Sequence, residues 1–236
     1  MSATIAALRL DLRLQRRYGF LYAAAFAAVL WIVVLNLLPA KVLGAALPYA
    51  LFGDLAIVGF FFIAGAVFFE KGERTLFALL STPLRFREYL LAKLGTLTMI
   101  AVTVSLAVVI PLRGLDFHPL TFLAGIVLTS LLMILLGFVT AAPYPSVSEW
   151  LMPALVPLVI VNVPLLSYSG VWPEPLLYLI PTHGSLLLLG AAFDQVALSW
   201  PQLLYALGYQ LLWIVGLFFL ARKVFERFVI SREGSS

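Results

Sequence analysis

The chain has 236 residues, of which 63% are hydrophobic and 11% are charged, and its mean hydropathy is +1.08. Because a soluble domain carries about 25% charged residues, this composition excludes a soluble globular domain and predicts a protein embedded in a membrane. The chain contains no cysteine, which excludes disulfides, thiolate chemistry and cysteine-ligated metals.

Residues 1–17 are expected to form an interfacial helix. Leucines alternate with polar residues in LRLDLRLQ, which is the period of a strand, but a lone strand beside a membrane would leave its backbone groups unpaired. On a helix, the four arginines of this segment fall within an arc of about 100°, beside an apolar edge. A basic tail without regular structure is the alternative.

Six apolar runs are long enough to cross a bilayer, which needs about 20 apolar residues per helix. They are residues 18–38, 48–69, 94–112, 120–141, 151–168 and 203–221. A seventh run, 176–193, is interrupted by Pro181-Thr182-His183-Gly184, so we expect an outer re-entrant or surface helical pair there. The sequence therefore predicts an all-α membrane protein, with six transmembrane helices in a single transmembrane domain, 1–236.

Basic residues predict the orientation of these spans. All of the 15 Lys and Arg residues except Lys41 and Arg113 lie before the first span, between spans two and three, or after the last span. Since positive loops stay on the cytoplasmic side, both termini are expected inside, with the chain in the cytoplasmic membrane. The net charge of +4 thus reports topology, and a nucleic-acid partner is not needed to explain it.

Polar residues within the spans are candidates for a transport pathway. Asp54 is the clearest case, because ionising a carboxylate in lipid is costly. It either faces an aqueous cavity or reaches the headgroups. Asn36 and Asn162 are further candidates for pathway lining. A stand-alone secondary transporter that couples to an ion through Asp54 is therefore one functional hypothesis.

The sequence contains neither a nucleotide-binding motif nor a complete hydrolase motif. No glycine is followed by another five residues later, as a P-loop requires, so no nucleotide site is recognisable in this chain. A rhomboid-like serine hydrolase is a remote alternative, built on Ser169 with His183 as its base, but the motif Ser167-Tyr168-Ser169-Gly170 lacks the first glycine. We expect no catalytic residue and no metal site.

The loop between spans two and three is unusually rich in charge. Its cations follow from topology, but Glu70 and Glu73 do not. The stretch ERTLFALL places Leu76, Leu79 and Leu80 at helical spacing, and Thr82-Pro83 is typical of a new helix start. We expect a short helix along the cytoplasmic face, then a break, then a helix that enters span three. An ordinary basic loop is the alternative.

This loop resembles the first cytoplasmic loop of permeases of the ABC type-2 exporter family. The resemblance rests on Glu70-x-x-Glu73-Arg74-Thr75-Leu76-x-x-Leu79-Leu80-Ser81-Thr82-Pro83, followed by EYLLAKL, and on the layout of the whole chain. Within that family the chain is most similar to small drug-exporter permeases, including those for fluoroquinolone export. One departure is Arg74, where many members have glycine.

The resemblance implies a permease subunit that works as a dimer with a separate ATP-binding subunit. The second permease chain would be identical or different, and ATP and magnesium would bind to the partner ATPase, leaving this chain without a cofactor. Loop 70–92 would supply a coupling helix whose contacts are made or positioned by Glu70, Glu73, Arg74, Leu76, Leu79, Leu80 and Pro83. Glu149 in the second cytoplasmic loop would touch the same partner. The substrate would be a hydrophobic or amphiphilic small molecule that passes between the two chains.

Overall fold

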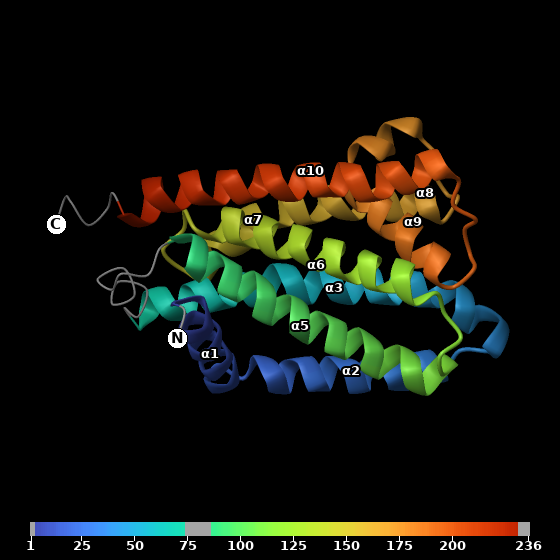
Figure 1. Ribbon diagram of the computed structural model, residues 1–236, viewed down its shortest axis with the longest axis horizontal. Helices are drawn as coiled ribbons and strands as arrows, with labels where there is room; N and C mark the ends of the chain where they lie inside the picture. Colours follow the sequence, from blue (N-terminus) through green and yellow to red (C-terminus); the bar gives the residue numbers. More distant parts are fainter. Residues whose placement is uncertain (1–2, 74–85, 231–236) are drawn as a thin grey trace.

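The computed structural model describes residues 3–73 and 86–230, and every regular element in these two ranges is helical (Figure 1). The predicted all-α class is therefore confirmed. In chain order the elements are α1 (Ala3–Arg17), α2 (Phe20–Asn36), α3 (Ala40–Gly72), α5 (Phe86–Arg113), α6 (Pro119–Ala141), α7 (Val147–Asn162), α8 (Pro164–Tyr168), the 3-10 helix η1 (Pro175–Leu179), α9 (Thr182–Ala192), α10 (Trp200–Phe225) and the π-helical turn η2 (Glu226–Ile230).

Five helical segments of the described chain are long and apolar enough to cross a membrane. They are α3, α5, α6, α7 together with α8, and α10. Helices α1 and α2 supply a sixth if they are counted as one span, bent by 65°. Gly19 lies at this bend with φ +80°, a left-handed conformation that suits glycine. The predicted interfacial helix is thus a separate helix that turns away from the first apolar one.

Helices α3 and α6 form the centre of the bundle. Their backbones approach closely at Gly137, where any side chain would collide with the carbonyl of Phe60. Gly59 makes a second close approach, since a Cβ there would lie 3.0 Å from Met133. Small residues of this kind allow membrane helices to gain van der Waals contact. Most of α3 and α6 is buried, whereas α7 and α10 keep most of their surface exposed.

The bundle has two distinct ends (Figure 1). One end, which we call the terminal end, holds α1, the last turn of α3 and the last turn of α10. The other, which we call the distal end, holds α8, α9 and the start of α10. The described parts of the expected cytoplasmic loops, namely residues 70–73, 86–92 and 142–146, belong to the terminal end, and residues 176–193 belong to the distal end.

The segment 176–193 differs in detail from the expected helical pair. The Pro181-Thr182-His183-Gly184 sequence starts α9 rather than breaking a helix, and only the short η1 precedes it. Proline has no N–H to leave unpaired at a helix start. Helix α9 is almost entirely buried, with Gly184 against Ala206 of α10 and the hydroxyl of Thr182 donating to Val161 of α7 at 2.6 Å.

Candidate coupling site

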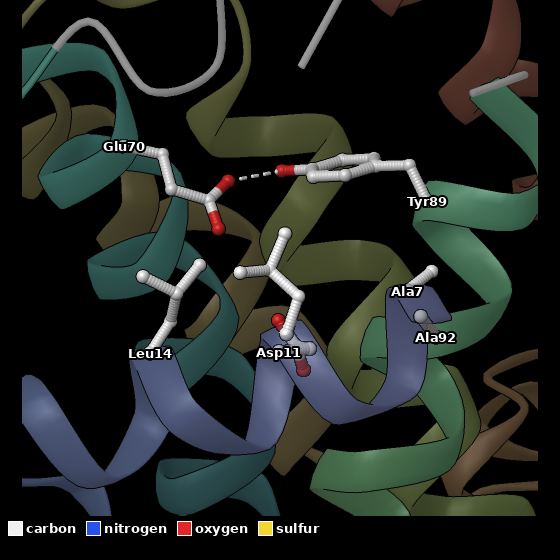
Figure 2. A pocket seen from close by; sticks show the side chains of 7 residues that line it. Ala7, Asp11, Leu14, Glu70, Tyr89 and Ala92 are labelled. Atoms are coloured by element: carbon white, nitrogen blue, oxygen red, sulfur yellow. Dashed lines mark hydrogen bonds between the residues drawn. The ribbon is translucent and has the colours of Figure 1, made fainter. Parts of the chain in front are cut away.

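At the terminal end, Glu70 in the last turn of α3 faces α5. The hydroxyl of Tyr89 donates to Glu70 Oε2 at 2.6 Å, and the ammonium of Lys93 donates to Glu70 Oε1 at 2.6 Å. Tyr89 and Lys93 are four residues apart on α5 and therefore share one face of that helix. Figure 2 shows Glu70 and Tyr89 pointing toward each other, with α1 passing beside them.

Helix α1 joins the same group of side chains through Asp11. Lys93 donates to Asp11 Oδ1 at 2.9 Å, and Asp11 Oδ2 accepts a hydrogen bond from Gln15 at 2.7 Å and another from the hydroxyl of Thr96. Since Asp11 and Gln15 are four residues apart on α1, both project toward α5. Asp11, Glu70, Tyr89 and Lys93 form what we call the buried ion cluster.

The buried ion cluster holds two carboxylates and one ammonium. The side chains of Lys93, Asp11 and Glu70 are only 2%, 7% and 1% exposed. Such burial is costly unless every charge is paired and hydrogen-bonded. Here the carboxylate in excess is met by neutral donors, namely Tyr89, Gln15 and Thr96. The adjoining cavity of about 20 Å³ is far below the size of a drug pocket, so the cluster serves to hold α1, α3 and α5 together.

Glu73, directly after α3, ties the α1–α2 bend to the start of the charged loop. Its carboxylate accepts from Arg17 at 2.9 Å and from the hydroxyl of Tyr18 at 3.1 Å. The ring of Tyr18 also stacks on Phe69, with centroids 4.9 Å apart. At the other side of the loop, the ring of Phe86 lies 4.6 Å from that of Phe225 on α10. Both ends of the loop are thus packed against other helices.

Two expected cytoplasmic loops meet at the terminal end. The ammonium of Lys71 donates to the carbonyls of Ala142 and Tyr144, at 2.8 and 2.7 Å, which joins the end of α3 to the loop before α7. Glu149 lies in the first turn of α7 and is exposed, and its backbone N–H donates to the N-cap Ser146. A partner at this end would therefore face both loops.

The structure separates the roles expected for the loop residues. Glu70 is buried, so it positions helices and is not accessible to a partner protein. Glu73 is partly exposed. The remaining predicted coupling residues lie outside the residues that the structure describes; they are Arg74, Leu76, Leu79, Leu80 and Pro83.

The three candidate pathway residues lie apart from one another. Asp54 is 5% exposed and accepts a hydrogen bond from Trp31 at 3.0 Å, in a packed space between α2, α3 and α5 with no room for a water molecule. Asn36 and Asn162 each donate to a carbonyl of their own helix, one turn earlier. The structure therefore does not bring these three residues together.

The two residues of the hydrolase alternative are not paired with each other in the described structure. The hydroxyl of Ser169 donates to the carbonyl of Leu166 at 3.0 Å. The imidazole of His183 is buried and packs on Tyr178, with ring centroids 4.0 Å apart. A nucleophile activated by this histidine would need a hydrogen bond between them.

Sequence reasoning missed Asp11, Tyr89 and Lys93. Asp11 stands among leucines and arginines, and Lys93 stands one residue before the expected third span, so both were explained by amphipathicity and topology. The available signal was an acid on the side of α1 that carries Ala7 and Gln15, which are also buried. An acid at helical spacing from small or amide side chains indicates a polar contact facing inward.

Comparison with known proteins adds an independent finding. The sequence profile of the fluoroquinolones export permease protein family matches residues 2–233. Two curated relatives from Mycobacterium tuberculosis, strains CDC 1551 / Oshkosh and ATCC 25618 / H37Rv, are each named a fluoroquinolones export permease protein. Each is 50% identical to this chain over 235 residues, which covers 99% of this chain and 99% of the relative.

Proposed function

This chain belongs to the fluoroquinolones export permease protein family, and on that premise we propose that it is the membrane subunit of an ATP-binding-cassette exporter. In this proposal two permease chains form the substrate pathway, and a separate ATPase subunit binds to each at the terminal end. The match over nearly the whole chain carries the proposal, because it covers 99% of this chain and 99% of each relative, both of which are named export permeases.

The geometry of the terminal end supports the ATPase partner. The charged loop starts at Glu73, which is bonded to Arg17, and its other end packs on α10 through Phe86. Because both ends of this loop are packed against the bundle, a movement of a docked protein would displace α3 and α5, the helices that the loop connects. The buried ion cluster would pass this movement from α3 to α1 and α5, because its charges resist separation.

The orientation follows from the same proposal. Arg9, Arg13, Arg16 and Arg17 are exposed on α1 at the terminal end, where Arg222 and Lys223 also end α10. A cytoplasmic location for this end satisfies the positive-inside rule. It also places the charged loop where ATP is available. The membrane would then be the cytoplasmic, or inner, membrane.

The proposed mechanism is alternating exposure of an apolar pathway. ATP binding and hydrolysis on the partner would close and open the two ATPase subunits, and the coupling loops would follow that movement. The proposed cargo is a hydrophobic or amphiphilic drug of the fluoroquinolone type, as the names of the relatives indicate. This chain would supply positioning and pathway, whereas the partner would supply the nucleotide chemistry.

Co-purification tests the partner. The triple variant Glu73→Lys, Arg74→Glu and Leu79→Asp reverses two charges of the proposed coupling loop and places an acid on the apolar face that the sequence predicts for it. We expect it to insert into the membrane normally and to lose the ATPase subunit during purification.

A matched control is Asp194→Lys, which reverses an exposed charge at the distal end and should retain the ATPase. An unchanged complex together with unchanged export in the triple variant would contradict the proposed docking surface.

A further inference from the structure

A cleft of about 370 Å³ opens at the distal end, inside a single chain. Its walls come from the start of α3, the end of the α7–α8 pair, η1, α9 and the segment that leads into α10. The lining includes Ala45, Tyr49, Tyr168, Tyr178, His183 and Gln195, and it carries no Asp, Glu, Lys or Arg. The volume falls within the range of small-molecule sites, unlike the cavity beside the buried ion cluster.

Two polar atoms at this cleft lack a hydrogen-bond partner within the described residues. They are the hydroxyl of Tyr168 and Nδ1 of His183, and both atoms are buried. His183 as a residue is only 3% exposed. Buried polar groups are nearly always hydrogen-bonded, and the neighbouring Thr182 and Ser185 follow that rule through Val161 and Gln210. Since both residues line the cleft, a group bound there can supply the missing hydrogen-bond partner once the side chains adjust.

The aromatic walls of the cleft are held in place by the surrounding helices. The phenol of Tyr168 lies against Gly190 of α9, where a side chain would collide with the hydroxyl, and its ring meets Tyr49 edge-on at 5.1 Å. The 3-10 helix that carries Tyr178 is fastened to α10, because Tyr205 donates to the carbonyl of Tyr178 at 2.5 Å. Because these rings are already held in place, binding of a flat ligand does not carry the entropic cost of ordering them.

We propose that this cleft is an exit-side binding site for the exported molecule, which it holds as a planar aromatic compound without net charge, hydrogen-bonded to Tyr168 and His183. The inference rests on the proposed function for the identity of the cargo. The aromatic walls favour a flat ring system. A lining without charged side chains penalises a ligand with net charge, because no opposite charge compensates its desolvation, whereas the opposite charges of a zwitterion such as ciprofloxacin partly compensate each other. The site lies within one chain, apart from a path between two permease chains.

Direct binding to the purified permease tests this site. The full chain, in lipid nanodiscs without any ATPase, is titrated with ciprofloxacin as the fluoroquinolone probe, and the dissociation constant is measured by calorimetry. Tyr168→Phe removes only a hydroxyl and should weaken binding roughly tenfold, as the loss of one buried hydrogen bond predicts. Ala45→Trp fills the cleft from an exposed position and should abolish binding.

Tyr22→Phe is the matched control, because Tyr22 is 70% exposed on α2 and should bind as the wild type does. Melting temperatures near that of the wild type confirm that the variants are folded. Equal affinity of wild type, Tyr168→Phe and Ala45→Trp would overturn the site.

A second measurement tests the binding site and the proposed ABC mechanism independently of each other. ATP-driven export is assayed with the permease and its ATPase subunit reconstituted in vesicles. Binding with the expected variant pattern supports the cleft even when no ATP-driven export is found, and that result counts against the ABC mechanism alone. Export at the same rate by the wild type and by Ala45→Trp overturns the cleft as an exit site and leaves the exporter standing.

Discussion

The ammonium of Lys93 on α5 lies 2.6 Å from the carboxylate of Glu70 on α3, and both side chains are buried inside the protein. A second acid, Asp11 of α1, shares the same ammonium at 2.9 Å. The ammonium of Lys93 on α5 therefore links α1 and α3 through one carboxylate from each helix. Lys93, whose charge agrees with the positive-inside topology, thus also holds the helices of the terminal end together.

Removing the shared cation is expected to destabilise the protein strongly. Lys93→Met keeps the length and apolar character of the side chain but leaves Asp11 and Glu70 buried beside each other without a counter-charge. Loss of one partner from a buried ion pair costs about 3–5 kcal/mol. The measurement is thermal unfolding of the purified protein in detergent. Lys41→Met, at an exposed position, should change the midpoint little, and equal midpoints for both variants would contradict the role of the cluster.

The close approach of α3 and α6 predicts a specific sensitivity at Gly137. Gly137→Val places a branched side chain against the carbonyl of Phe60, so the two helices must separate and the packing between them is lost. We expect a destabilisation of about 1–3 kcal/mol or more, as for overpacked cores. Gly216→Val on α10 meets no atom within 4 Å and serves as the control. The readout is the yield and melting temperature of the folded protein.

Asp54 distinguishes an ATP-driven exporter from an ion-coupled carrier. Asp54→Asn keeps an oxygen that accepts from Trp31 but removes the titratable carboxylate. We expect ATP-driven export to continue, because in the proposed mechanism the partner ATPase supplies the energy and Asp54 fastens α3 to α2. The measurement is drug export from vesicles with and without ATP, and with and without an ion gradient. Export that needs the gradient and disappears in Asp54→Asn would favour the carrier.

The stability of the distal end should depend on pH through His183. Burial lowers the pKa of His183 below its usual value of 6.5, so the unfolded chain binds a proton there more readily than the folded protein does. Its contribution to stability is therefore complete above about pH 6.5 and is lost as the pH falls below that value. We expect the melting temperature to drop between pH 7 and pH 5, and to drop less in His183→Gln.

The other histidine provides the control for this pH dependence. His118 is exposed and lies 2.8 Å from Asp194, so His118→Gln should retain the share of the pH response that comes from His183. A wild-type response that His183→Gln leaves unaltered would exclude burial of this imidazole as the cause.

The sequence by itself determined the all-helical class and the approximate positions of the spans, because a stretch of apolar residues can satisfy its backbone in lipid only as a helix. It also predicted a separate helix at 1–17. The family resemblance was drawn from the charged loop and the layout of the chain, and the match over residues 2–233 confirms a drug-export permease. These conclusions depend on local composition and order along the chain, which a sequence displays directly.

Only the tertiary structure decided which charges face inward. Asp11 and Lys93 are 82 residues apart in sequence, and no periodicity within α1 or α5 relates one to the other. Their pairing depends on how the helices cross, which is set by close contacts such as Gly137 with Phe60 and by the bend at Gly19. The distal cleft also depends on how helices pack, because Tyr168 and His183 line one cavity only when α8, η1 and α9 are packed together.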